Sequence, residues 1–251
     1  MVILMLSSFF GFLSIVIFSS VYYVDFKWIH RIKEQYLTSF SAGIGVVYVF
    51  IYMLPHLSKG QHLISTHFQH HALIGGQYSM YLIALIGFIF FYVFDTFLPH
   101  TQRLPTDDYD TRSDLAFYWT SVIFVCLYSL LIGYVVGSYA SNDLSYQFKY
   151  LIAYVVHFLA IKYGIYHIFP EKYDKIARYP IIASLFIGYF IALFANFVPL
   201  TLAITETMIE AFLTGAMILT VFKHELPNER DSKTWAFSVG ILLSLALFTF
   251  L

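Results

Sequence analysis

The chain has 251 residues, of which 59% are hydrophobic and 12% are charged, whereas an ordinary soluble domain carries about 25% charged residues. This composition predicts an all-α integral membrane protein in which residues 1–251 form a single transmembrane domain. The net charge of -1 and the lack of a Lys/Arg run exclude a nucleic-acid partner, and the single cysteine, Cys126, excludes disulfides and Cys-rich metal sites.

Apolar runs bounded by polar turns recur along the chain, and each is close to the length of about 20 residues that a membrane-spanning helix needs. There are eight: Val2 to Val24, Leu37 to Leu57, Tyr78 to Leu98, Leu115 to Ala140, Lys149 to Phe169, Tyr179 to Pro199, Leu202 to Phe222 and Thr234 to Leu251. The first has no basic stretch before it and no Ala-x-Ala site after it, so we expect a retained span rather than a signal peptide. The sequence therefore predicts a multi-pass bundle of eight transmembrane helices.

Positive charges alternate between the connecting loops. Short cytoplasmic loops are enriched in Lys and Arg, and alternate loops here carry Lys27, Arg31, Lys33, Arg103, Arg112, Lys172, Lys175, Arg178, Lys223, Arg230 and Lys233. The intervening loops carry only Lys59 and Lys149. This asymmetry predicts that both termini lie outside.

Half of the ten histidines fall between His56 and Gln77, a segment that we predict to be an outward-facing loop. Neutral imidazole is a common ligand of zinc, copper, iron and nickel. One interpretation is a weak exterior metal site, and the other is a polar loop in which histidines cluster without a ligand. The residues of the first interpretation are His62, His67, His70 and His71.

Motifs of soluble enzymes are missing from the sequence. It contains no Gly-rich phosphate loop, no serine nucleophile elbow and no zincin motif. We therefore expect no enzymatic activity and no cofactor.

The fifth run places Lys162, with His157 before it, inside an apolar segment. An ionisable group at that depth costs a few kcal/mol or more, so it normally faces a partner or a water-filled cavity. The candidate counter-charges are Glu206 and Glu210, four residues apart on the seventh run. One hypothesis is a proton or ion relay through Lys162, His157, Tyr128 and a glutamate. The other is that Lys162 reaches the headgroups or forms one static pair.

Two further sets of residues lie in the central runs. Gly133 and Gly137 are four residues apart, and small residues at this spacing let helix backbones approach closely. We expect them, with Cys126, to pack helices. The tyrosines either form a polar seam or pack as ordinary aromatic residues; they are Tyr128, Tyr134, Tyr154 and Tyr163.

The second and seventh runs each carry a recognisable pair of motifs. The second reads Ala42–Gly45 and then Tyr52–His56, and the seventh reads Thr214–Met217 and then Lys223–Pro227. The first pair is similar to an Ala-Gly…His-Leu-Leu-Pro-Glu helix, with tyrosine and histidine in place of its His and Glu. The second is similar to a Gly…Glu-Leu-Pro-Glu helix. In order and spacing the chain resembles, over nearly its whole length, the ZIP family of zinc and iron transporters, which implies eight spans with both termini outside.

The resemblance implies a metal path built from the fourth and fifth spans, and the ligands of that path are replaced here. The fourth span of the family carries His-Asn/Ser-x-Pro-Asp/Glu-Gly, whereas this chain has Tyr128 for the histidine and Ile132 for the carboxylate, with Ser129 and Gly133 retained. Zinc needs nitrogen, sulfur or carboxylate ligands, which isoleucine cannot supply.

The fifth and sixth spans depart from the family in the same way. His157 keeps its place, but Phe158, Ala160 and Ile161 stand where an acid, a proline and a ligand are expected, and Tyr179 replaces a glutamate. An ammonium at Lys162 would also repel a dication. We therefore expect no metal at the family site and instead a central polar site of Tyr128, Ser129, His157, Lys162, Tyr163, Tyr179, Glu206 and Glu210.

These replacements predict a ZIP-like membrane protein that has lost the divalent-metal site of the family. Such a protein is either transport-incompetent, with an accessory or regulatory role, or carries a non-metal substrate. Its expected partners are the lipid bilayer and another membrane protein or a second copy. The alternative is a carrier of zinc, iron or another divalent metal whose ligands have moved to the histidine loop, His157, Glu206 and Glu210.

Overall fold

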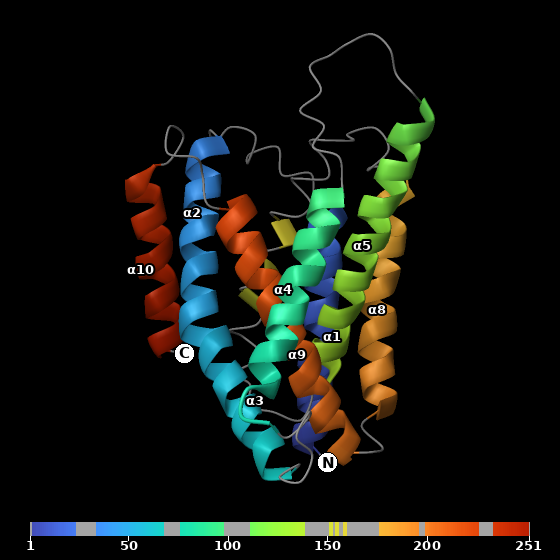
Figure 1. Cartoon of the computed structure of the whole chain (residues 1–251), viewed down its shortest axis with the longest axis vertical. Coiled ribbons are helices and arrows are strands. Elements are labelled where there is room, and N and C mark those ends of the chain that lie inside the picture. Colours follow the sequence, from blue (N-terminus) through green and yellow to red (C-terminus); the bar gives the residue numbers. More distant parts are fainter. Residues whose placement is uncertain are drawn as a thin grey trace.

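The computed structural model describes residues 2–23, 34–67, 76–97, 111–138, 151–152, 154–155, 158–159, 176–195, 199–225 and 233–250 (Figure 1). Within these ranges the chain is helical apart from the turn before Ser79 and the residue before Thr234, and no strand occurs there. The prediction of an all-helical protein is confirmed. Most of the fifth predicted span, Lys149 to Phe169, lies outside the described residues.

Most of the described helices have bounds within about four residues of a predicted apolar run. The helices are α1 (Val2–Tyr23), α2 (Glu34–Val47), the π-helix η2 (Tyr48–Met53), α3 (Leu54–His67), α4 (Ser79–Phe97), α5 (Thr111–Ser138), α8 (Arg178–Ala195), α9 (Pro199–Thr220), the π-helix η5 (Val221–Glu225) and α10 (Thr234–Phe250). Four helical segments in the described part of the chain are long and apolar enough to cross a membrane: Ser39–Thr66, Tyr118–Ser138, Arg178–Ala195 and Ile204–Lys223. Shorter apolar helices occupy Ser8–Tyr23, Ser79–Phe94 and Thr234–Thr249.

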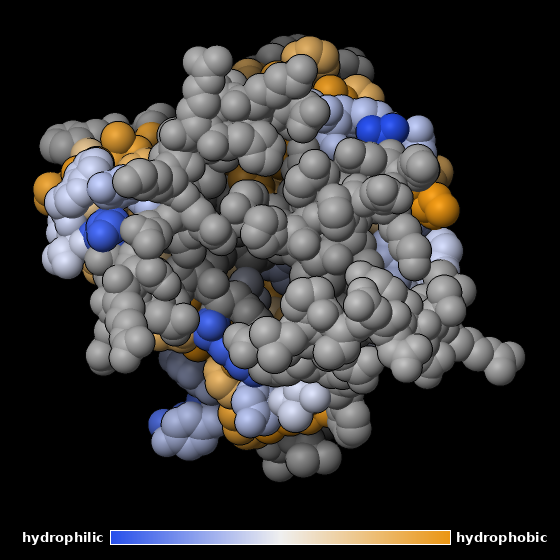
Figure 2. Space-filling model, turned by 90° about the horizontal axis from the view of Figure 1, so that it is seen from above, coloured by the Kyte–Doolittle hydropathy of each residue, from blue (hydrophilic) through white to orange (hydrophobic). Residues whose placement is uncertain are grey.

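The outer surface of the helices is strongly apolar. Viewed from above, hydrophobic residues reach the outside of the bundle on several sides (Figure 2). Phe194 is 73% exposed, Leu242 66% and Ile123 65%. Exposed apolar residues on this scale are unusual on a soluble monomer and typical of a surface that faces lipid or a partner.

The structure corrects the predicted loop between His56 and Gln77. The helix does not end near Leu57 but continues as α3 to His67. Leu57 and Ile64, seven residues apart, are 6% and 0% exposed, so this polar segment has one apolar stripe that packs inward. The predicted span ended at Leu57, two residues after Pro55, whereas the helix passes this proline and continues for ten residues beyond Leu57.

A π-helical segment, η2, immediately precedes the turn that contains Pro55. Proline has no N–H to donate and its ring crowds the carbonyl four residues earlier, which breaks an ordinary α-helical turn. In η2 the hydrogen bonds reach back five residues, as in the bond from the Leu54 amide to the Val49 carbonyl. In this wider turn the rings of Tyr48 and Tyr52 are stacked, with centroids 5.2 Å apart and planes 10° apart.

Glycines hold three helix pairs in backbone contact. The closest pairs are α5 with α8, α4 with α9, and α2 with α10. Within each pair, a methyl group built on a glycine would meet a backbone carbonyl of the partner helix: Gly133 meets Leu185, Gly188 meets Leu130, Gly87 meets Phe212, Gly215 meets Ala84, Gly43 meets Phe237 and Gly240 meets Phe40. Gly137 similarly faces Tyr189 and Ala192. The predicted packing role of Gly133 and Gly137 is confirmed.

The pairs assemble around α9. In addition to α4, this helix contacts α3, α5 and α8, and α1 packs on α5 and α8. The hydroxyl of Tyr189 in α8 donates a hydrogen bond of 2.7 Å to the carbonyl of Ser8, which fixes α1 to α8. The central position of α9 matters for function because this helix carries Glu206 and Glu210.

Gln61 joins α3 to the start of α4. Its Nε2 donates to the Gly76 carbonyl at 2.8 Å, and its Oε1 accepts from the Met80 amide at 2.9 Å. The Met80 amide belongs to the first turn of α4, where backbone N–H groups have no partner within the helix. Gln61 therefore caps α4 from a neighbouring helix, and it is only 9% exposed.

We expect Gln61→Leu to lower the free energy of unfolding by about 1–3 kcal/mol, because it leaves the Met80 amide buried without its acceptor. Thermal unfolding of the purified protein in detergent measures the change. Gln77→Leu, at an exposed position of the turn before α4, is the matched control with little expected effect. Equal effects of the two substitutions would refute the capping role.

Candidate functional site

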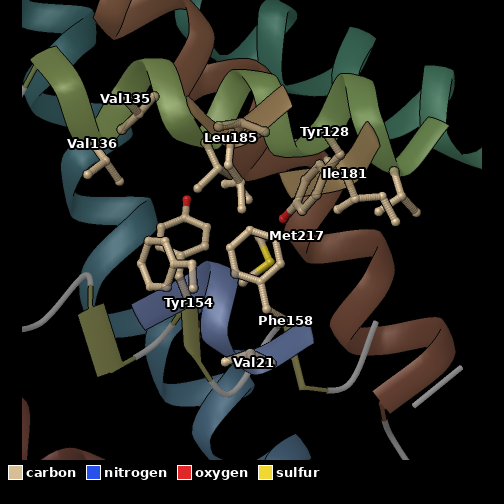
Figure 3. Packing of buried hydrophobic residues seen from close by; sticks show 14 of the residues in the cluster. Val21, Tyr128, Val135, Val136, Tyr154, Phe158, Ile181, Leu185 and Met217 are labelled. Atoms are coloured by element: carbon tan, nitrogen blue, oxygen red, sulfur yellow. The ribbon is translucent and has the colours of Figure 1, made fainter. Parts of the chain in front are cut away.

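Among the described residues, Tyr128, Ile132 and Phe158, which the resemblance assigns to the metal path, lie in apolar packing. Ile132, Leu185, Tyr154 and Phe158 are each 0% exposed and Tyr128 is 3% exposed, and all belong to one hydrophobic cluster. Figure 3 shows the rings of Tyr154 and Phe158 facing Tyr128 and Leu185 across the interior. Apart from the hydroxyl groups of the two tyrosines, these side chains are hydrocarbon, which cannot bind zinc.

Aromatic contacts close this cluster against α1. The ring of Phe158 lies 5.3 Å from that of Phe18 and 5.8 Å from that of Tyr22, measured between centroids. On the opposite side, Tyr128 meets Phe91 edge to face at 5.5 Å. Such pairs contribute about 0.5–1.5 kcal/mol beyond their area burial. Aromatic packing therefore describes the rings of Tyr128 and Tyr154, and the Tyr154 side chain also forms a hydrogen bond with Tyr48, as the interpretation of a polar seam expects.

Two residues of the predicted central polar site lie at very different depths. Ser129 is 0% exposed within α5, as expected of a central residue. Tyr179 is 52% exposed, and its hydroxyl accepts a 3.3 Å hydrogen bond from Arg178 at the start of α8. The inward face of α8 belongs instead to Ile181 and Leu185, four residues apart and both 0% exposed. Tyr179, two residues before Ile181, therefore projects outward, and the prediction that placed it at the centre is corrected.

Several predicted residues fall outside the described part of the chain. These are His157, Lys162, Tyr163, His70 and His71, together with the side chain of His67. His62 is exposed on α3. The relay through Lys162 and the exterior histidine site therefore remain predictions.

Glu206 and Glu210 lie on α9, but their carboxyl groups have different neighbours. Glu206 interacts electrostatically with Tyr134 of α5, whose hydroxyl bonds to Thr205. Glu210 is 9% exposed, and its Oε2 lies 3.3 Å from Nε2 of His56 in α3. The observed partner of Glu210 is thus a histidine that the sequence analysis had assigned to the exterior loop.

A recess surrounds the pair of His56 and Glu210. It is a small recess, and it is lined by Tyr52, Met53, His56, Leu57, Met80, Thr207, Glu210, Ala211 and Thr214. The ring of Tyr52 stacks on the imidazole of His56, with centroids 5.5 Å apart and planes 8° apart. The hydroxyl of Thr214 donates to the backbone carbonyl of Glu210 at 2.7 Å. Both members of the pair therefore have a fixed environment.

Two comparisons bear on this site. No known family matches this chain, and no curated protein matches it. Among the described residues, no group of three or more His, Cys, Asp or Glu side chains is arranged to hold a metal ion. The pair of His56 and Glu210 is accordingly defined by its own geometry.

The sequence analysis missed the role of His56 for a local reason. In the sequence His56 stands in the place of a family glutamate and is the first histidine of the predicted loop, and neither position indicates a partner within the bundle. The signal that was available is the spacing of Tyr48, Tyr52 and His56, four residues apart, which predicts one polar stripe if the helix continues through Pro55.

Proposed function

We propose that this chain is a ZIP-like membrane protein of eight spans, with both termini outside, in which the metal path of the family is closed. It acts as an accessory or regulatory protein through its helix surfaces, or it carries a non-metal substrate. One observation carries the proposal: Ile132 and Phe158, which replace expected metal ligands, are 0% exposed within one apolar cluster. Dehydrating a divalent ion there would provide no ligands in exchange.

The helix contacts give further support. Gly43, Gly133 and Gly215 belong to the motifs that suggested the resemblance, and each one meets the backbone of a neighbouring helix. The chain has therefore kept residues that serve packing while replacing residues that would bind a cation. This division is expected when a fold is retained and its transport site is lost.

Uptake measurements test the proposal. We expect proteoliposomes that contain the purified chain to take up zinc, iron and manganese no faster than protein-free liposomes. The His157→Ala variant is the control, because His157 is the one histidine of the family site that remains. Robust uptake by the natural chain that is lost in His157→Ala would overturn the proposal.

A second candidate is a divalent-metal carrier with relocated ligands. The observation that favours it is the imidazole and carboxylate of His56 and Glu210, 3.3 Å apart on two helices. Isothermal calorimetry with zinc distinguishes the candidates, since a relocated site requires binding that weakens when His67, His70 and His71 are replaced. Lack of zinc binding to the intact protein eliminates this candidate.

A further inference from the structure

Glu210 is a carboxyl group inside a helix that is long and apolar enough to cross a membrane, Ile204–Lys223. It lies six residues from Ile204, about 9 Å along the helix axis. An ionisable residue at this position is expensive unless it has a partner, and within spanning segments such residues commonly take part in ion or proton pathways. Glu210 therefore needs both a structural and a functional explanation.

His56 supplies the structural part. Its Nε2 lies 3.3 Å from Oε2 of Glu210, so a single proton between these atoms serves either group. The pair has the same net charge whether the proton is on the imidazole beside a carboxylate or on the carboxyl beside a neutral imidazole. Transfer of that proton over this distance thus adds no net charge to the interior.

The two members of the pair differ in the exposed fraction of their side chains. The side chain of His56 is 24% exposed and that of Glu210 is 11% exposed. One turn further along α3, Lys59 is exposed, and His62 follows it on the same helix. Exposure therefore falls from the polar end of α3 through His56 to Glu210, which makes the imidazole the more accessible of the two groups.

In the part of the chain that the structure describes, few other titratable groups lie near the pair. On α3 and η2 they are Lys59, which acts electrostatically on His56, and the phenols Tyr52 and Tyr48. On α9 the nearest acid is Glu206, which is directed toward Tyr134 of α5. The side chain that α4 contributes to the recess, Met80, does not titrate.

We infer that His56 and Glu210 form a proton-binding site, in which the imidazole passes protons between water and the buried carboxyl group. In the inward step a proton leaves Nε2 of the imidazolium for Oε2 of Glu210, and the neutral imidazole then takes another proton from a hydronium ion in the aqueous phase. The outward step is the reverse. No bond other than N–H and O–H forms or breaks.

The recess favours a proton over a metal ion as the ligand. Zinc in proteins is held by about four ligands, at least three of them from the protein. The recess offers one imidazole and one carboxylate, and its other lining residues are Tyr52, two threonines, two methionines, Leu57 and Ala211. A proton needs only the two groups that are present. The two proton-binding residues, His56 and Glu210, do not belong to the central apolar cluster, so this inference stands or falls separately from the proposed function.

Infrared difference spectroscopy tests the site directly. The full chain is reconstituted in nanodiscs of neutral lipid, and the C=O stretch of protonated carboxyl groups is followed after rapid steps of buffer pH. We expect one band that is lost in Glu210→Gln and moved in frequency in Glu210→Asp, which retains a carboxyl group. In His56→Gln the band should form at least tenfold more slowly, because the relay to water is missing.

Matched controls separate the site from its surroundings. His62→Gln changes an exposed histidine on the same helix, and Glu206→Gln changes the neighbouring acid of α9; both should leave the Glu210 band and its rate unchanged. The inference is overturned if no band depends on Glu210 at any pH, or if the band forms at the same rate in His56→Gln. Loss of the band on addition of zinc, with release of the proton, would overturn it in favour of a metal site.

Discussion

Phe158→Ala is expected to lower the free energy of unfolding by about 3 kcal/mol, the lower end of the range for a buried phenylalanine. The ring is 0% exposed and lies between Phe18 and Tyr22 of α1 and the cluster that includes Tyr154. Helices separated in lipid still have apolar surroundings, so the transfer contribution is small. The loss comes from the cavity and from the missing aromatic contacts.

Unfolding of the purified protein in mixed micelles, with increasing denaturing detergent, measures this loss. Phe194→Ala is the matched control, because Phe194 of α8 is 73% exposed and packs on little of the protein. We expect a change of less than about 0.5 kcal/mol for the control. If the two substitutions have equal effects, Phe158 does not close the interior. Zinc uptake should remain absent in Phe158→Ala, because an enlarged cavity contains no additional ligands.

The all-helical class and the positions of most helices were predictable from the sequence because they depend on local composition. Apolar runs near the length of a membrane span coincide with α1, α4, α5 and α10, and the four-residue spacing of Gly133 and Gly137 indicated a packing face that the structure confirms. Such features follow from the period of the helix and from side-chain size alone. They do not depend on which helix lies opposite.

The errors concern features that depend on the partner helix. Pro55 ends an isolated α-helical turn, but the π-helical segment before it accommodates the ring, and packing of Leu57 and Ile64 stabilises the continuation. The tertiary contacts of α3 with α9 and α4 thus prevail over a local signal. Because the segment after His56 was predicted to be a loop, His56 was expected outside the bundle.

The pairing of Glu210 illustrates the same limit. Charge alone identified Lys162 as a group in need of a partner, with Glu206 and Glu210 as its candidate counter-charges. The contact of His56 with Glu210 depends on which face of α9 meets α3, and no spacing within one helix contains that information. The sequence alone therefore identifies a buried ionisable residue as a candidate site, but it does not identify the partner of that residue.

Gly188→Ala is expected to lower the free energy of unfolding by more than about 3 kcal/mol, beyond the usual range for an inserted methyl group. A methyl group on Gly188 meets the Leu130 carbonyl and lies 2.9 Å from the Tyr134 amide nitrogen, so both obstacles are backbone atoms of α5. Because backbone atoms cannot move away by a change of rotamer, α5 and α8 must separate to make room for the methyl group. The higher helix propensity of alanine returns only about 1 kcal/mol.

The same detergent unfolding assay tests this expectation against Gly11→Ala. At Gly11 the nearest atom to an added methyl is a ring carbon of Tyr189 at 3.3 Å, which gives way by a small shift, so we expect a change of less than about 1 kcal/mol. Gly133 contacts α8 from the opposite side, where its methyl would meet the Leu185 carbonyl. Once the two helices have separated to accommodate one methyl group, the second methyl group costs less free energy. The double variant Gly133→Ala with Gly188→Ala should therefore lose less stability than the sum of the single variants. Simple additivity would show that the two glycines do not share one interface.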